Sequence, residues 1–156
     1  MRNAVVTPEG DRIRWVELPG GAPARVYMHG LGATSPAYFA ASAVHPLPTG
    51  RRSLLVDLLG HGHSDRPEGF GCTLEEHADA LAAVLTEAGA QGAELIAHSM
   101  GGAVAVVLAD RHPQPGVPAG ARRRQPGPRA PQYRRRGEQP DRLLPRVPGR
   151  RLGRGA

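Results

Sequence analysis

Ser99 stands in the segment whose residue types are best suited to covalent chemistry. The segment reads Ala97-His98-Ser99-Met100-Gly101-Gly102 and lies between the apolar runs 94–97 and 103–109. A serine on a tight turn between a strand and a helix presents its hydroxyl as a nucleophile, and small residues must flank it because the turn is strained. The first N–H groups of the helix would point at the reacting oxygen. The sequence therefore predicts that Ser99 is a nucleophile, and the alternative is a serine that only caps the helix.

A second glycine-rich segment, His29-Gly30-Leu31-Gly32, follows a predicted strand. Ligands bind at the carboxyl ends of strands in open parallel sheets, and glycines there let backbone N–H groups approach a ligand oxygen. We expect the N–H groups of Leu31 and Met100 to form a two-donor oxyanion hole. An ordinary glycine turn is the alternative interpretation.

A third polar segment, 57–65, begins with Asp57 and contains His61 and His63. An H-x-H pair is one arrangement of metal ligands, but no other ligand set with suitable spacing accompanies this pair. We therefore predict a structural loop here and no metal site. His98 directly precedes the candidate nucleophile, and we expect its ring to pack beneath the turn.

Alternating strand and helix patterns predict the elements that position these segments. Turn residues between two short strands indicate an antiparallel hairpin, and proline and glycine indicate a loop over 19–23. Strands that alternate with helices of ordinary length imply a parallel sheet with helices on both faces. The predicted fold class is α/β, with a mostly parallel sheet, an N-terminal antiparallel hairpin and flanking helices. The predicted strands are 5–7, 13–18, 25–28, 53–57 and 94–97.

Local signals also mark where the helices begin and end. Ser35-Pro36 is typical of a helix start, with the serine as cap and the proline at the first position, and it predicts a helix over 37–44. Thr73-Leu74-Glu75-Glu76 has the pattern of a capping box, and Gly89 is suited to end the helix that follows. The helix after Ser99 is apolar all round, so we expect it to be buried on both sides.

Charge divides the chain unevenly near residue 111. Residues 1–110 hold 7 arginines against 12 carboxylates, a net charge of −5, whereas residues 111–156 hold 13 arginines against two carboxylates, a net charge of +11. The second part also contains nine prolines, seven glycines and few large apolar residues. Such a composition buries too little apolar surface to offset the entropy of ordering the chain. We predict one domain over 1–112 and a disordered Arg/Pro/Gly-rich tail over 113–156.

Taken together, the three polar segments resemble motifs of the α/β-hydrolase superfamily, specifically its esterase-like and lipase-like serine hydrolases. The resemblance covers roughly residues 5–113, with 29–32 similar to the oxyanion loop, 57–65 to the D-x-x-G-H-G-x-S-D loop and 97–102 to the nucleophile elbow. It implies a small-molecule substrate with an ester-like bond and no cofactor. It also implies a site made of the nucleophile Ser99, the oxyanion donors Leu31 and Met100, and the supporting residues His29, Gly30, Gly32, Asp57, His98 and Gly101.

The resemblance is incomplete after the elbow. In this family the acid and then the histidine follow the nucleophile on later strands. Here His112 is the only histidine after Ser99, and Glu138 and Asp141 lie in the predicted tail, so neither the acid nor the base is assigned. We therefore expect weak or no turnover, and a marginal fold whose serine-bearing strand lacks a neighbour on one side.

Two further hypotheses concern the tail. Arginine, proline, glycine and alanine all have codons made only of G and C, so the abrupt change in charge suggests that the chain leaves its proper reading frame near residues 112–116, which the nucleotide sequence would test. The alternative function is a non-catalytic binding protein whose arginines contact nucleic acid or an acidic partner. Aromatic residues hardly interleave with these arginines, so we expect no specific nucleic-acid recognition.

Targeting signals are lacking in the sequence as given. The first residues lack the apolar core of a signal peptide, and no apolar run approaches the roughly 18–20 residues of a membrane helix. Cys72 is the only cysteine, so an intrachain disulfide is not possible and an inert thiol is expected. We expect a cytoplasmic protein without a membrane partner, and its oligomeric state is left open.

Overall fold

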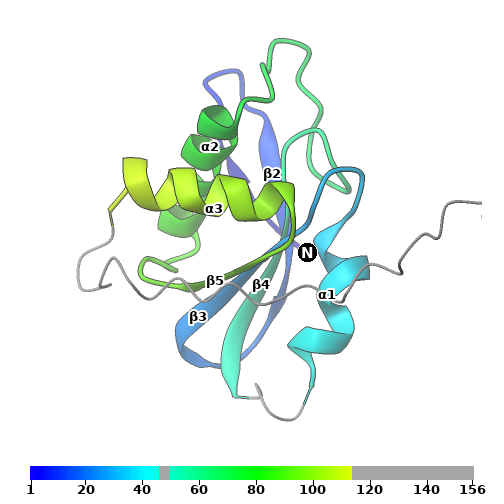
Figure 1. The fold of residues 1–156 in the computed structure, drawn as a ribbon, viewed down its shortest axis with the longest axis vertical. Coiled ribbons are helices and arrows are strands. Elements are labelled where there is room, and N and C mark those ends of the chain that lie inside the picture. The colour runs from blue at the N-terminus through cyan, green and yellow to red at the C-terminus, as the bar shows by residue number, and fades with distance from the viewer. Residues whose placement is uncertain (46–49, 114–156) are drawn as a thin grey trace, which may run out of the picture. The chain divides into compact units, whose positions relative to one another are not determined.

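The computed structural model describes residues 1–45 and 50–113, and its strands and helices alternate as predicted (Figure 1). Residues 114–156, which hold nearly all of the predicted tail, lie outside the described residues. The strands are β1 (Arg2–Val5), β2 (Arg12–Leu18), β3 (Gly21–Met28), β4 (Arg51–Asp57) and β5 (Glu94–Ala97). The helices are α1 (Ser35–Ala43), α2 (Leu74–Glu87) and α3 (Met100–Arg111).

The five strands form one mixed sheet in the order β1-β2-β4-β3-β5. β1 and β2 form the predicted antiparallel hairpin, and β2 also pairs antiparallel with β4. β4, β3 and β5 are parallel, as predicted. The carboxyl ends of these three strands therefore share one edge of the sheet, which brings the three polar segments of the sequence to the same edge.

Helices cover both faces of the sheet, with α1 on one face and α2 and α3 on the other (Figure 1). Alternate side chains of β3 enter two different cores, because successive side chains of a strand point to opposite faces. Tyr27 packs with Phe39 of α1, whereas Val26 and Met28 pack in the larger core beneath α2 and α3. Both cores pack against β3 and β4, so these two strands are covered on both faces.

The sheet differs from the sequence prediction mainly at β3 and β1, whereas β2 and β4 begin only one and two residues earlier than predicted. β3 begins at Gly21, so the loop predicted over 19–23 is wrong in its second half. The Gly21 N–H donates to Gly50 O at 2.7 Å, and this long-range pairing draws a proline- and glycine-rich segment into the sheet. β1 runs from Arg2 to Val5 and shares only Val5 with the strand predicted over 5–7. Thr7 accepts a hydrogen bond from the Gly10 N–H and belongs to the turn.

The helix boundaries agree with the local signals except at the start of α1. The capping box of α2 is present, and Gly89 follows the helix with a φ of 58°. The N-cap of α1, however, is Thr34 and not Ser35, and no side chain caps this helix. The Ser35 hydroxyl is buried and donates to Val56 O at 2.6 Å, so tertiary contacts replace the predicted cap.

α3 is buried on one side only, so the prediction that it is buried on both sides is wrong for the residues that the structure describes. Gly101, Val104 and Leu108 face the core, whereas Val106 is 49% exposed. The described strands also leave β5 at the end of the sheet, with β3 as its neighbour. Among the described helices, none combines the length and apolar character needed to cross a bilayer.

Candidate active site

The turn from β5 to α3 has the backbone of a strained elbow. Ser99 stands between the two elements with φ 51° and ψ −118°, a combination that side chains resist and that glycine alone adopts freely. Its side chain is exposed and makes no capping hydrogen bond with α3. The geometry therefore favours presentation of the hydroxyl over the alternative of a helix-capping serine.

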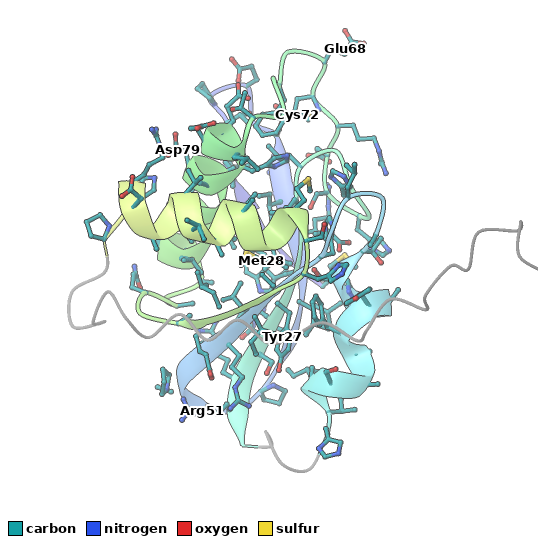
Figure 2. The ribbon with its side chains drawn as sticks, viewed as in Figure 1. Tyr27, Met28, Arg51, Glu68, Cys72 and Asp79 are labelled. Atoms are coloured by element: carbon teal, nitrogen blue, oxygen red, sulfur yellow. The ribbon has the colours of Figure 1, made fainter. Side chains whose placement is uncertain are left out.

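Gly101 allows α3 to begin directly against the end of β3. A Cβ at this position would lie 2.6 Å from His29 O and 2.7 Å from Met28 O, both of which are backbone atoms that cannot move aside easily. Met28, labelled in Figure 2, is the last residue of β3. A glycine here thus places the N-terminus of α3, and with it the Met100 N–H, beside the candidate oxyanion loop.

The loop 29–32 lies in contact with the elbow. A Cβ at Gly30 would stand 2.9 Å from His98 Nδ1 and 3.1 Å from Ser99 Cβ, so only a glycine lets the two segments approach this closely. Leu31 is 77% exposed, and Gly32 has a φ of 71°. Within the described residues neither the Leu31 N–H nor the Met100 N–H donates a hydrogen bond to the protein, so both donors remain open to a ligand.

His29 supports the candidate oxyanion loop as a neutral ring. Its Nδ1 lies 2.7 Å from Gly30 O and its Nε2 accepts from the Leu58 N–H at 3.0 Å, so the proton is on Nδ1. Burial is the main cause that lowers the pKa of His29, and this favours the uncharged form. With both ring nitrogens engaged, His29 supports the backbone and has no nitrogen left to act as a base.

Asp57 ties its own loop to α1. Its Oδ1 accepts from the Ser35 N–H at 2.8 Å, and its Oδ2 accepts from the His63 N–H at 3.0 Å. A Cβ at Gly62 would collide with the carboxylate. This buried carboxylate is held by two backbone donors, and His63 Nδ1 also lies 3.2 Å from its Oδ2. In the part of the chain that the structure describes, no three metal-binding side chains cluster.

Ser35 is the supporting residue that the sequence analysis missed. Its backbone N–H donates to Asp57, its hydroxyl donates to Val56 O, and the hydroxyl accepts from the His29 N–H at 3.0 Å. Ser35 therefore joins the candidate oxyanion loop, α1 and β4. The sequence signal, a serine before a proline, is the same as that of a helix cap, so only the fold distinguishes the two roles.

His98 is half-buried and directly precedes the serine of the elbow. Its ring stacks on Tyr38 of α1, with ring centroids 4.8 Å apart and an interplanar angle of 25°. Tyr38 in turn makes an edge contact with Phe39 at 4.8 Å. His98 Nδ1 is buried and has no partner in the described structure. The stack holds the residue before Ser99 against α1, and within the described residues no hydrogen bond joins its ring to Ser99.

His112 lies at the opposite end of α3 from Ser99. The helix has 12 residues, which corresponds to about 18 Å along its axis. His112 Nε2 lies 2.6 Å from Asp79 Oδ1, and Arg111 binds the same carboxylate through two nitrogens. Hydrogen bonds from Arg111 and then His112 lower the pKa of Asp79 to about 2. Asp79, labelled in Figure 2, is thus part of a surface ion pair between α2 and α3, remote from the elbow.

Comparisons with known proteins agree with this arrangement. A family model described as "alpha/beta hydrolase fold" matches residues 26–116. An acetyltransferase component of the acetoin cleaving system of Cupriavidus necator is 35% identical over 106 residues, which are 68% of this chain and 28% of that protein. A 2-hydroxymuconate semialdehyde hydrolase of Pseudomonas putida is 33% identical over 103 residues, which are 60% of this chain and 33% of that protein.

A solved structure shows the same fold over the described strands and helices. An esterase from Exiguobacterium antarcticum superposes with a TM-score of 0.61 and 27% identity, over 69% of this chain and 39% of that chain. This chain spans about a third of the length of the relatives it matches. The family model covers more than half of the 156 residues, and the elbow and the candidate oxyanion loop lie within it, so this chain belongs to the α/β-hydrolase family.

Proposed function

We propose that Ser99 is the nucleophile of a site that hydrolyses ester-like bonds, with the N–H groups of Leu31 and Met100 as oxyanion donors. The single observation that carries the proposal is the backbone of Ser99, which has φ 51° and ψ −118° at an exposed turn before α3. Strain of about 1–3 kcal/mol at a non-glycine residue persists where function requires it. The esterase named above and the hydrolase from Pseudomonas putida are consistent with this class of reaction.

In the proposed reaction the Ser99 Oγ attacks the carbonyl carbon of the substrate, and the carbonyl oxygen becomes an oxyanion. The two N–H groups and the N-terminal dipole of α3 would stabilise the charge that develops there. In a comparable protease one such donor contributes on the order of 10²–10³ in rate. The alkoxide or other leaving group departs when the tetrahedral intermediate collapses, and water then releases the acyl group from Ser99.

Turnover also needs a base that accepts the proton of the Ser99 hydroxyl. In the described residues Ser99 Oγ has no hydrogen bond to a histidine, since His98 stacks on Tyr38 and His29 is engaged on both ring nitrogens. In the serine protease subtilisin, loss of the triad base lowers turnover by a factor on the order of 10⁶. We therefore expect slow acylation of Ser99 and weak turnover by this 156-residue chain.

The experiment is covalent labelling with a fluorophosphonate, which reacts with activated serines, followed by peptide mass spectrometry. We expect one adduct, on Ser99, that Ser99→Ala abolishes. Ser42 is also exposed, on α1, so Ser42→Ala is the matched control and should leave labelling unchanged. An adduct of equal yield on Ser42, or no adduct on Ser99 after prolonged exposure, would show that the elbow does not activate its serine.

A further inference from the structure

We propose that His63 and Asp57 form a second catalytic site, in which the His63 ring attacks activated carboxylic esters without help from Ser99. The His63 Nδ1 lies 3.2 Å from Asp57 Oδ2. The other ring nitrogen, Nε2, has no hydrogen-bond partner among the described residues. This proposal does not depend on the chemistry proposed for the elbow.

The carboxylate of this pair is buried and anchored. The Asp57 side chain is 2% exposed, whereas that of His63 is 58% exposed. The Ser35 N–H donates to Oδ1 at 2.8 Å, and the His63 N–H donates to Oδ2 at 3.0 Å. An ion pair between two mobile surface side chains lacks such anchoring and contributes little. Here the carboxylate stays in place, and the ring is the group that a substrate can reach.

The loop also fixes the backbone of His63. The preceding residue, Gly62, has a φ of 51°, and a Cβ there would collide with the Asp57 carboxylate. The His63 carbonyl accepts from Arg14 Nη1 at 2.9 Å, and the Ser64 hydroxyl donates to Asp57 O at 2.6 Å. The ring is therefore held against the carboxylate by contacts on both sides of it in sequence, as catalytic groups require.

The contact with the carboxylate decides which ring nitrogen carries the proton. A carboxylate oxygen can only accept hydrogen bonds, so Nδ1 of the neutral His63 ring holds the proton. Nε2 then keeps a lone pair and can act as a nucleophile. Asp57 also stabilises the positive charge that develops on the ring when Nε2 forms a bond. The pair thus has the two parts of a histidine–carboxylate dyad.

In the proposed reaction the Nε2 lone pair attacks the carbonyl carbon of the ester, and the bond to the alcohol oxygen breaks, so that this oxygen departs as an anion. The acyl group is then bonded to Nε2, and Asp57 balances the positive charge of the ring. Water adds to the acyl carbon, the bond to Nε2 breaks, and one proton of the water passes to the solvent, which restores the neutral ring. Within the described residues no acid is bonded to Nε2 to protonate a leaving group. The substrates are therefore esters whose leaving groups are stable anions.

Steady-state hydrolysis of p-nitrophenyl acetate tests the site in a Ser99→Ala, Cys72→Ser background, which removes the elbow hydroxyl and the exposed thiol. His63→Gln should lower the remaining turnover by roughly tenfold or more. His45→Gln is the matched control, because His45 is another exposed histidine, and it should leave turnover unchanged. Equal rates in the two variants, or no turnover in the background, would overturn the proposal. Fluorophosphonate labelling of a chain that keeps Ser99 reports the elbow separately.

Asp57 is a positioning residue, and its test combines turnover with the ring tautomer. Nitrogen-15 NMR should place the His63 proton on Nδ1 in the unmodified chain, and a proton on Nε2 would refute the arrangement. In Asp57→Asn the amide donates to Nδ1, so the proton moves to Nε2 and turnover should fall, as it does about 10⁴-fold for the same exchange in a serine protease. Unchanged turnover in a folded Asp57→Asn would refute the role of the carboxylate. Circular dichroism reports folding, and if this variant does not fold, the tautomer of the unmodified chain and the rate of His63→Gln decide.

Discussion

Substitution of Ser99 by glycine should leave the protein more stable than substitution by alanine. Ser99 adopts φ 51° and ψ −118°, and its side chain makes no capping bond that either substitution would remove. Alanine keeps the Cβ and therefore the backbone strain. Glycine removes the Cβ and adopts the mirror image of the extended region freely.

The expected difference follows from two opposing contributions. A residue held in a sparsely populated backbone region costs about 1–3 kcal/mol, which glycine relieves. Glycine also gains freedom in the unfolded chain, which costs roughly 0.5–1 kcal/mol relative to alanine. The net result favours Ser99→Gly over Ser99→Ala by up to about 2.5 kcal/mol in the free energy of unfolding.

Urea denaturation followed by circular dichroism measures this difference, with both variants and the unmodified chain at one protein concentration. Equal slopes of the transition would show that the unfolded states are comparable. If Ser99→Gly proves less stable than Ser99→Ala, the elbow is not strained in solution, and the argument from backbone geometry to nucleophile fails with it.

Gly101→Ala should destabilise the protein by about 1–3 kcal/mol, since the new Cβ would press on two backbone oxygens, and urea denaturation measures the loss. Gly102→Ala is its matched control, because the same atom meets open space there; equal losses would contradict the close approach. Burial lowers the pKa of His29 and of His77, so the unfolded chain takes up their protons first as the pH falls. The free energy of unfolding should therefore keep its full value above about pH 6.5 and decline below that pH. Denaturation at several pH values should show that the free energy of unfolding falls less steeply with decreasing pH in His77→Leu than in the unmodified chain. An equally steep fall in both proteins would show that His77 does not contribute to this pH dependence.

Local patterns were sufficient for the elements that carry the site. The capping box at Thr73, the helix-ending Gly89 and the strand–turn–helix around Ser99 all depend on contacts within a few residues, and all are present. The same is true of the hairpin turn, where the Gly10 N–H donates a hydrogen bond to Thr7 O. The order of the strands has no such local signature, and it came from the structure.

Where prediction failed, a distant partner outweighed the local preference. Ser35 has the sequence of a cap, yet its hydroxyl bonds to β4 because the sheet brings Val56 within reach. Gly21 and Pro23 are poor strand formers, yet β3 begins at Gly21 because β4 supplies a ladder. The outer side of α3 is apolar in sequence and exposed at Val106, since burial depends on what lies opposite and not on the helix itself.

The sequence by itself determined that one serine would stand on a strained turn before a helix, because small residues on both sides and an apolar run on each flank leave the chain few other conformations. Only the tertiary structure decided that Gly30 lies against that serine, that His29 is a neutral support, and that α3 starts against Met28 and His29. The reason is physical: these contacts join segments far apart in sequence across neighbouring parallel strands, and the strand order that creates them is set by the packing of the whole sheet.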